Sequence, residues 1–234
     1  MEALLFADRP GAALRPLSWR TPAALLPVAG KPLVVHALEA LAEAGIRRAV
    51  VVVSPGADEI EAALGNGERW GISLEWVLSR QGESADAVEQ RLGARIPGEF
   101  LSLRGDVFVG RFLPAFLEGA AGKGGAPSVA ARVDGRPTGV RLLRAGAPRP
   151  LGLLGDPESV PWRDSEGVPF VEVEGAAFSP VDSLAAFHRV NLDAAAGRLP
   201  GFVPPGQDVA VGVRTGRRTR LPLRAVRGWP RRRG

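Results

Sequence analysis

The first part of the chain places a buried strand, a helix and a second buried strand in succession. The apolar run EALLFA (residues 2–7) precedes a loop rich in Pro and Gly, and LVVHALEALAEAG (33–45) then has apolar residues at helical spacing and ends on a glycine. The run RRAVVVV (47–53) is dense in β-branched residues, as in strands covered on both faces. Parallel strands need a helical crossover, so this order constrains the chain to an α/β fold.

The same alternation continues to about residue 120. Further helices are expected at GADEIEAALG (56–65), SADAVEQRLG (84–93) and RFLPAFLEGA (111–120), and further strands at SLEWVLS (73–79) and GEFLSLRGD (98–106). Beyond that point Gly and Pro become frequent and the β-like runs shorten, before a helix expected from Val181 to Ala196. We therefore predict a mostly parallel sheet with a mixed edge.

Composition narrows the class of protein. At 234 residues, 45% of them hydrophobic and 24% charged, the chain suits one large soluble domain, alone or with an appendage. Its apolar runs are shorter than the roughly 20 residues that cross a bilayer, so we expect no membrane partner. The chain has no cysteine, which excludes disulfides, thiolate metal sites and cysteine nucleophiles and fits a cytoplasmic location. Glu2 near the start also argues against a secretory signal.

The net charge of +5 is concentrated at the C-terminus. Residues 213–234 contain nine arginines and no acidic residue, whereas the rest of the chain is mildly acidic. Such a tail suits RNA or an anionic surface, but no aromatic or Gly-rich RNA-reading pattern accompanies it. Nucleic acid is therefore not expected as the main partner.

The tail also shows a weak period of six residues. Val213, Thr219 and Ala225 recur at this step, which is typical of left-handed β-helix coils, although such coils usually need about three turns to stack stably. The alternative is a disordered Arg-rich tail. We predict an α/β domain over residues 1–205 and a tail over 206–234 that resembles a truncated hexapeptide-repeat coil.

Several segments in the right order resemble the sugar-phosphate nucleotidylyltransferases, also called nucleotide-sugar pyrophosphorylases. The resemblance is carried by LRPLSWRTPAALLPVAGKPLVVHALEALAEAGI, RRAVVVV, QGESADAV, LSLRGDV and SPVDSLAAFHRVNLDA, and spans most of residues 1–200. It implies a Rossmann-like nucleotidyltransferase fold, Mg²⁺ as cofactor, and transfer of a nucleotidyl group to a sugar 1-phosphate with release of pyrophosphate. The related molybdenum-cofactor nucleotidylyltransferases share LLPVAGKPL, but the hexapeptide-like tail argues against them.

The chemistry of such a transfer demands positive charge. A sugar phosphate oxygen attacks the α-phosphorus of a triphosphate, so two anions must meet and charge builds on the leaving pyrophosphate. Backbone N–H groups of a Gly-rich loop, an arginine, a lysine and bound Mg²⁺ are the usual means. Loss of one such contact typically costs about 3 kcal/mol of transition-state stabilisation.

The family's phosphate-binding loop is degenerate in this chain. Its Gly-x-Gly-Thr-Arg pattern falls on residues 9–13, where only the second glycine survives, as Gly11, and the arginine position holds Ala13. The family's loop lysine falls on Ala23. Arg9, Arg15 and Arg20 lie nearby as candidate catalytic substitutes, but each sits at a different offset from the family's cations, and displaced charge is not equivalent for in-line transfer.

Two aspartates are candidates for the Mg²⁺ site. Asp106 follows the expected strand 98–106, where ligands bind in open α/β sheets, and matches the family's metal-binding aspartate. An ordinary Gly-Asp turn is the alternative. The second metal-binding acid would fall on Pro180, so Asp182 becomes a ligand only in a shifted register.

Other positions match the family in part. Gln81 and Gly82 match the loop that reads the nucleobase, and Gly139 matches a glycine on the sugar side. Glu83 looks like an insertion, and the family's sugar-phosphate Glu-Lys-Pro run is not recognisable in residues 147–162. His36 lies on the apolar face of its helix and is interpreted as a packed side chain.

Three functions remain open from these residues. The leading hypothesis is a nucleotidyltransferase-like protein with weak or no catalysis, which binds a nucleotide or nucleotide sugar as a regulatory or accessory subunit, beside an active homologous subunit or as a homo-oligomer. The alternative is an active Mg²⁺-dependent sugar-1-phosphate nucleotidylyltransferase. A third hypothesis is an assembly module that docks through its Arg-rich end.

Overall fold

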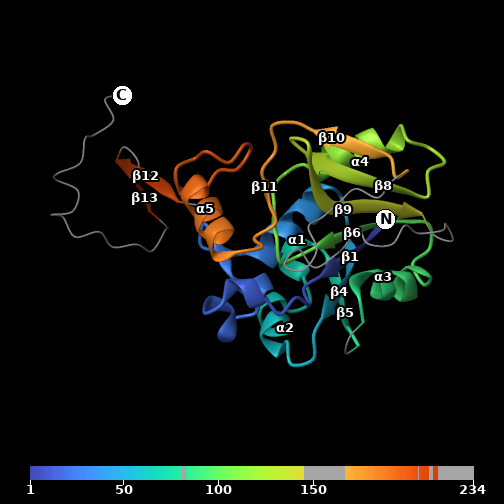
Figure 1. Ribbon diagram of the computed structural model, residues 1–234, viewed down its shortest axis with the longest axis horizontal. Helices are drawn as coiled ribbons and strands as arrows, with labels where there is room; N and C mark the ends of the chain where they lie inside the picture. The colour runs from blue at the N-terminus through green and yellow to red at the C-terminus, as the bar shows by residue number, and fades with distance from the viewer. Residues whose placement is uncertain (81–82, 145–166, 205, 211–212, 216–234) are drawn as a thin grey trace.

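A seven-stranded sheet forms the centre of the computed structural model, which describes residues 1–80, 83–144, 167–204, 206–210 and 213–215 (Figure 1). The strand order is β10-β8-β9-β6-β1-β4-β5. These strands are β1 (Glu2–Phe6), β4 (Arg48–Val53), β5 (Ser73–Leu78), β6 (Glu99–Arg104), β8 (Ser128–Val133), β9 (Arg136–Arg144) and β10 (Phe170–Val173).

The sheet is mixed and mostly parallel, as the sequence predicts. Strand β1 pairs in parallel with both β4 and β6, and β5 extends this parallel half at one edge. Strand β9 runs antiparallel to β6 and β8, and β10 returns in parallel beside β8. The carboxyl ends of β1, β4, β5 and β6 therefore lie at one edge, where open α/β sheets bind their ligands.

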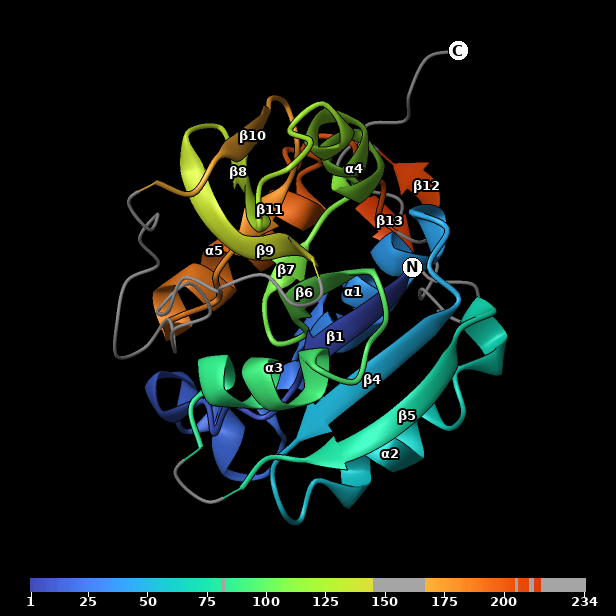
Figure 2. The same ribbon diagram turned by 90° about the vertical axis from the view of Figure 1, so that its right-hand side faces the viewer.

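Helices cover both faces of the sheet (Figure 2). Helices α1, α2 and α4 pack against one face, and their apolar side chains join those of β1, β4 and β6 in the largest core cluster. Helix α3 covers the other face, where Val88 and Leu92 contact a second cluster that includes Phe6 and Phe100. The helices are α1 (Leu33–Glu43), α2 (Asp58–Leu64), α3 (Ala85–Gly93), α4 (Leu113–Ala121) and α5 (Leu184–Ala195).

The helices that the sequence predicts are confirmed, and two of them begin at serine caps. The Oγ of Ser84 accepts a hydrogen bond from the N–H of Ala87 at the start of α3. Ser183 does the same for Ala186 at the start of α5. Each cap satisfies a backbone donor that the helix itself leaves without an acceptor.

A smaller layer joins α5 to two short antiparallel pairs of strands. Strands β2 (Pro27–Val28) and β3 (Lys31–Pro32) form one antiparallel pair, and β7 (Phe108–Val109) and β11 (Phe178–Ser179) form the other. The third core cluster joins Val28 of β2, Phe108 of β7 and Val190 of α5 to Leu33 at the start of α1.

The described part of the tail is an antiparallel pair of strands. Strands β12 (Gln207–Ala210) and β13 (Val213–Thr215) pair with a register irregularity between them. Antiparallel pairing differs from the parallel stacking of β-helix coils. The coil itself stays a prediction, because residues 216–234 lie outside the described residues.

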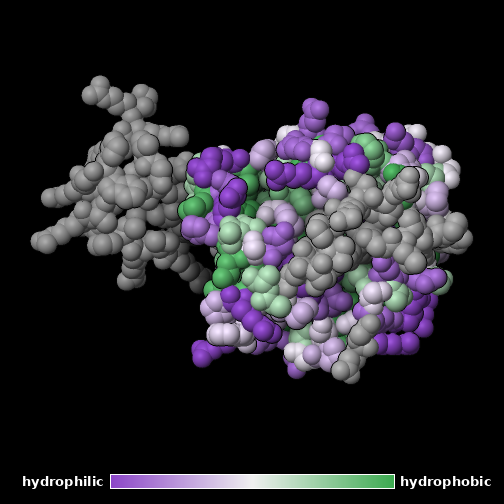
Figure 3. Space-filling model, in the orientation of Figure 1, coloured by the Kyte–Doolittle hydropathy of each residue, from purple (hydrophilic) through white to green (hydrophobic). Residues whose placement is uncertain are grey.

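On the face seen in Figure 3, the described residues are mainly hydrophilic, and apolar side chains gather around α5. Leu184 and Leu192 on this helix, and Val203 after it, are among the exposed large hydrophobic residues. No helix among the described residues is long and apolar enough to cross a membrane.

Candidate functional site

Two arginines and two aspartates meet where β1 and β6 end. Asp8 and Arg9 follow β1, while Arg104 is the last residue of β6 and Asp106 follows it. The Nε and Nη2 atoms of Arg104 donate to the two carboxylate oxygens of Asp106 at 2.9 and 2.7 Å. Nη2 of Arg104 also donates to Oδ1 of Asp8 at 3.1 Å. The formal charges of these four residues sum to zero.

Arg9 completes this cluster from the loop side. Its Nε lies 3.3 Å from Oδ2 of Asp106, and its Nη2 donates to the backbone carbonyl of Asp106 at 2.8 Å. The same Nη2 donates to the carbonyl of Val181 at 3.2 Å. Arg9 therefore joins the loop after β6 to the loop before α5, although 97 and 172 residues separate the partners in sequence.

The surroundings shift the pKa values of the two aspartates in opposite directions. Burial alone would raise the pKa of Asp106, but Arg104 and Arg9 together outweigh burial and hold this pKa below its usual value. Burial raises the pKa of Asp8, and the attraction of Arg104 offsets it only in part. Asp106 is thus the firmly ionised partner of the arginines.

Mg²⁺ does not fit the residues at this site. Asp106 has no exposed surface, and both of its carboxylate oxygens accept hydrogen bonds from Arg104. The side chain of Asp182 accepts from the Oγ of Ser183 at 3.2 Å. The described residues contain no group of three acidic or histidine side chains able to hold a metal ion. The roles of Asp106 and Asp182 as metal ligands stay predictions, and a cation at Asp106 would have to displace its contacts with Arg104.

The predicted phosphate-binding loop has a glycine turn at Gly11, but alanines stand at the two predicted cation positions. Gly11 adopts a left-handed conformation with φ 67°, and its carbonyl accepts a hydrogen bond from the Oγ of Ser18 at 2.5 Å. A Cβ on Gly11 would lie only 3.0 Å from the Cβ of Ala23. The glycine is required for the turn and for this close contact.

The two positions at which the family carries loop cations differ in environment. Ala13 is exposed, whereas Ala23 is completely buried in the cluster beneath α5. The candidate substitutes also differ, because Arg9 is 5% exposed and committed to Asp106, while Arg15 and Arg20 are exposed on the loop. Of the three candidate substitutes, Arg15 and Arg20 are therefore the two whose side chains are exposed on the loop.

The predicted base-reading residues Gln81 and Gly82 lie outside the described residues. Their neighbour Glu83 fastens this loop to α3. Its carboxylate accepts two hydrogen bonds from Arg91 at 2.8 and 2.7 Å and one from the N–H of Arg80 at 3.0 Å. The hydrogen bonds from Arg91 lower the pKa of Glu83 to about 2. The residue that looks like an insertion is therefore an anchor.

The predicted sugar-side residue Gly139 lies in β9 with φ 72°, a conformation that favours glycine. Two residues later, Arg141 is completely buried, and its Nη2 donates to both carboxylate oxygens of Glu89 on α3 at 2.9 and 2.7 Å. The same Nη2 lies 3.8 Å from Asp86. This ion pair fixes α3 to the antiparallel part of the sheet.

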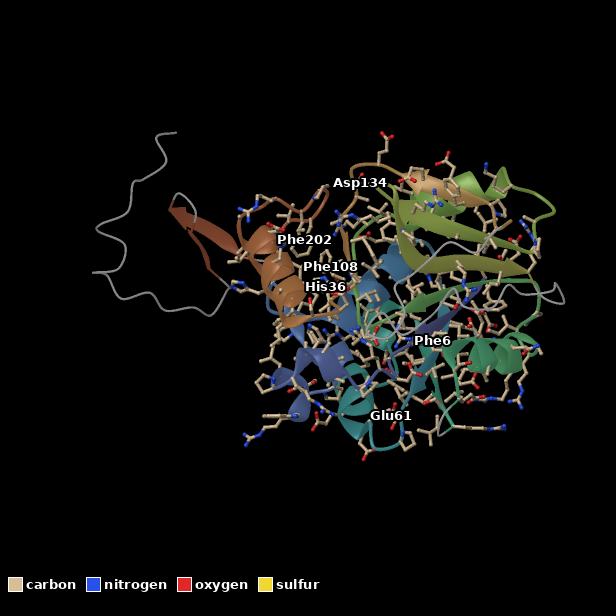
Figure 4. All side chains as sticks on the ribbon, in the orientation of Figure 1. Phe6, His36, Glu61, Phe108, Asp134 and Phe202 are labelled. Carbon is tan, nitrogen blue, oxygen red and sulfur yellow. The ribbon has the colours of Figure 1, made fainter. Side chains whose placement is uncertain are left out.

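His36 is a packed side chain, as its place on the helix predicts. Its ring lies 4.9 Å from Phe108 and 5.6 Å from Phe202, and Nε2 is 2.9 Å from the carbonyl of Val28 (Figure 4). Burial lowers its pKa, although the Val28 carbonyl opposes this shift. A hollow of ≈ 110 Å³ beside it is lined by residues that include Lys31 and Glu39, which form an ion pair with each other.

Sequence reasoning missed Asp8 and Arg104 as members of the site. Two signals could have identified them. Asp8 and Arg9 place a charged pair directly after the expected strand at residues 2–7, where ligands bind in open α/β sheets. Arg104 and Asp106 are two residues apart, so their side chains share one face of an extended segment.

Comparison with known proteins identifies the family to which the sequence of this chain is similar. Residues 3–138 match the nucleotidyl transferase family. The chain is 42% identical over 77 residues to glucose-1-phosphate thymidylyltransferase of Streptomyces griseus, covering 33% of this chain and 22% of that protein. It is 36% identical over 109 residues to N-acetylmuramate alpha-1-phosphate uridylyltransferase of Neisseria meningitidis serogroup B, covering 46% of this chain and 47% of that protein. The chain thus matches less than half the length of each curated relative.

Solved structures share the fold across a larger part of the chain. Inositol-1-phosphate CTP transferase from T. maritima superposes with a TM-score of 0.58 at 19% identity, covering 82% of this chain and 96% of that one. HddC from Yersinia pseudotuberculosis gives a TM-score of 0.61 at 13% identity, covering 82% and 98%. With more than half of its residues matching the family, the chain belongs to the nucleotidyl transferases, as its resemblance to the sugar-phosphate members predicts.

Proposed function

We propose that this protein binds a nucleotide or a nucleotide sugar with weak or no nucleotidyl transfer, and acts as a regulatory or accessory subunit of nucleotide-sugar metabolism. The observation that carries the proposal is the cluster of Asp8, Arg9, Arg104 and Asp106 at the ends of β1 and β6, in which both arginines are paired with aspartates. Its two positive and two negative charges cancel, so it offers a triphosphate no net attraction.

The neighbouring loop supports the same conclusion. Transfer at the α-phosphorus needs positive charge placed where the pyrophosphate departs. The loop has alanines at both family cation positions, and Arg9 is already committed to Asp106. Each missing contact costs about 3 kcal/mol of transition-state stabilisation. Two missing contacts that act independently therefore lower the rate by roughly ten-thousandfold.

Binding is supported by what the chain retains. The left-handed glycine of the loop is kept as Gly11, and β9 keeps Gly139 at positive φ. The parallel strands still present their carboxyl ends at one edge of the sheet, where α/β folds bind ligands. The curated relatives named above act on sugar phosphates, so we place the ligand among nucleotides and nucleotide sugars.

Isothermal titration with nucleoside triphosphates and nucleotide sugars tests the binding. We expect heat and a thermal shift with at least one of them. Gly139→Ala should weaken this binding by about tenfold or more, because a Cβ at positive φ strains β9 at the sugar side. Gly125→Ala is the matched control, since Gly125 also has positive φ but lies in the loop after α4. No heat with any ligand would contradict the proposal.

A pyrophosphate-release assay tests the alternative of an active transferase. Asp106→Asn is a poor control for such an assay, because Arg9 and Arg104 both pair with this buried carboxylate, so a loss of activity would report on a disturbed site as well as on catalysis. Arg15→Gln and Arg20→Gln change exposed residues instead, so a loss of activity in either variant would report on catalysis.

A further inference from the structure

Three oxygen atoms from two separate loops converge on the guanidinium of Arg9. They are a carboxylate oxygen of Asp106 at 3.3 Å, the backbone carbonyl of Asp106 at 2.8 Å and the backbone carbonyl of Val181 at 3.2 Å. Carboxylate and carbonyl oxygens are the donor set that hard divalent cations prefer. Here a side chain of the same chain supplies the positive charge.

The backbone at Val181 shows how tightly this convergence is held. Val181 is completely buried and has φ 50°, a conformation that is rare for a β-branched residue and costs on the order of 1–3 kcal/mol. Such a conformation persists only where its surroundings over-determine it. The Val181 carbonyl accepts from Arg9 in this conformation, so the Arg9 contact is one of the interactions that hold it.

We propose that Arg9 is an internal cation: its guanidinium occupies the position that a divalent cation would take between the loop after β6 and the loop before α5. It neutralises Asp106 and fastens the two loops together. The folded site is therefore independent of divalent cations. This inference concerns the protein without a nucleotide, so it can hold or fail separately from the proposed function.

A simpler account treats Arg9 as an ordinary buried ion-pair partner, and the two accounts differ in what can replace it. Removal of an ordinary partner leaves a site that no metal ion repairs. Removal of an internal cation leaves oxygens already directed at a vacated volume, one of them from the carboxylate of Asp106. A divalent cation should then restore part of the lost stability.

The test is thermal unfolding of Arg9→Gly with and without Mn²⁺. The wild type should show the same Tm in EDTA and in about 10 mM Mn²⁺, whereas Arg9→Gly should melt lower and recover by about 4 °C with Mn²⁺ if it binds with a Kd near 1 mM. Arg9→Gly with Asp106→Asn should not recover. Arg198→Gly is the matched control, because it removes an exposed arginine paired with Asp193 on the surface.

Two results would overturn the proposal. One is an equal Mn²⁺ shift in wild type and Arg9→Gly, and the other is no recovery of the folded variant. If Arg9→Gly does not fold, Arg9→Gln takes its place in the same titration, since it removes the charge with a smaller loss of volume. Independently, ¹⁵N amide spectra of the wild type should show no selective Mn²⁺ broadening at Asp106 and Val181, and such broadening would exclude an internal cation.

Discussion

Ala13 and Ala23 occupy the two cation positions of the family's loop, but the chain can accept a charge at only one of them. Ala13 is exposed, so Ala13→Arg should change the free energy of unfolding by less than about 0.5 kcal/mol. Ala23 is completely buried against Gly11, so Ala23→Lys must displace neighbours or bury an ammonium, at a cost on the order of 3 kcal/mol. Urea denaturation of both variants measures this difference, and equal effects would contradict it.

The buried pair of Arg141 and Glu89 stabilises α3 only while both partners are present. Arg141→Leu should lower the free energy of unfolding by about 3–5 kcal/mol, because it leaves a carboxylate buried without its guanidinium. Arg141→Leu combined with Glu89→Leu should recover most of that loss, since two apolar side chains then meet. Denaturant midpoints of the two single variants and the double variant provide the test, and simple additivity would contradict it.

His36 makes stability depend on pH in the mildly acidic range. Its folded pKa is lowered from 6.5, so the unfolded chain binds a proton that the folded chain resists. The stability that neutral His36 contributes to the folded chain is complete above pH 6.5, and it is lost as the pH falls from 6.5 towards the folded pKa. His36→Gln should flatten the dependence of Tm on pH below 6.5. An unchanged slope in this variant would assign the dependence to other groups.

At the scale of elements, Asn191 connects α5 to the β2–β3 hairpin. Its Oδ1 accepts from the N–H of Ala29 at 3.1 Å, and its Nδ2 donates to the carbonyl of Pro27 at 3.2 Å. Ala29 and Gly30 both have positive φ, as a tight hairpin requires. A side chain that satisfies both backbone groups therefore stabilises the hairpin against α5.

Asn191→Ala should lower the free energy of unfolding by about 2 kcal/mol, because two hydrogen bonds with the hairpin are lost. Asn191→Asp keeps the acceptor for Ala29 and should cost less. Hydrogen exchange at Ala29 should accelerate in the alanine variant while the amides of β1 stay protected. Uniform acceleration would show instead that the whole domain had loosened.

The elements were predictable because their signals are local. The β-branched density of β4 and the helical spacing of α1 each lie within one short segment, so the parallel half of the sheet followed from the sequence. The strand pairing at the other edge did not follow, because β9 pairs with β6, and β10 with β8, through contacts distant in sequence.

The site was less predictable than the fold. The loss of loop cations could be read from Ala13 and Ala23, and the packed His36 from its helix face. The partnership of Arg9 with Asp106 could not, because 97 residues separate them and only the folded sheet brings them together. The positive φ of Val181 has no local signal either, since it is imposed by its surroundings.

For the whole molecule, the proposed function implies a scaffold kept without the charges that transfer needs. The sheet, the helices on both faces and the glycine turn are present, while the positions predicted to neutralise a departing pyrophosphate hold alanines, and Arg9 is paired with Asp106. An α/β frame is stabilised by apolar burial, whereas transfer depends on a few charges, so the first can persist without the second.

The most direct test of this account is the rate of pyrophosphate release from nucleoside triphosphates and sugar 1-phosphates with Mg²⁺, measured beside an active family member under the same conditions. The account predicts a rate at least about a thousandfold below that of the active enzyme, with ligand binding still detectable by titration. A rate within about tenfold of the active enzyme, reduced by Arg15→Gln or Arg20→Gln, would contradict it.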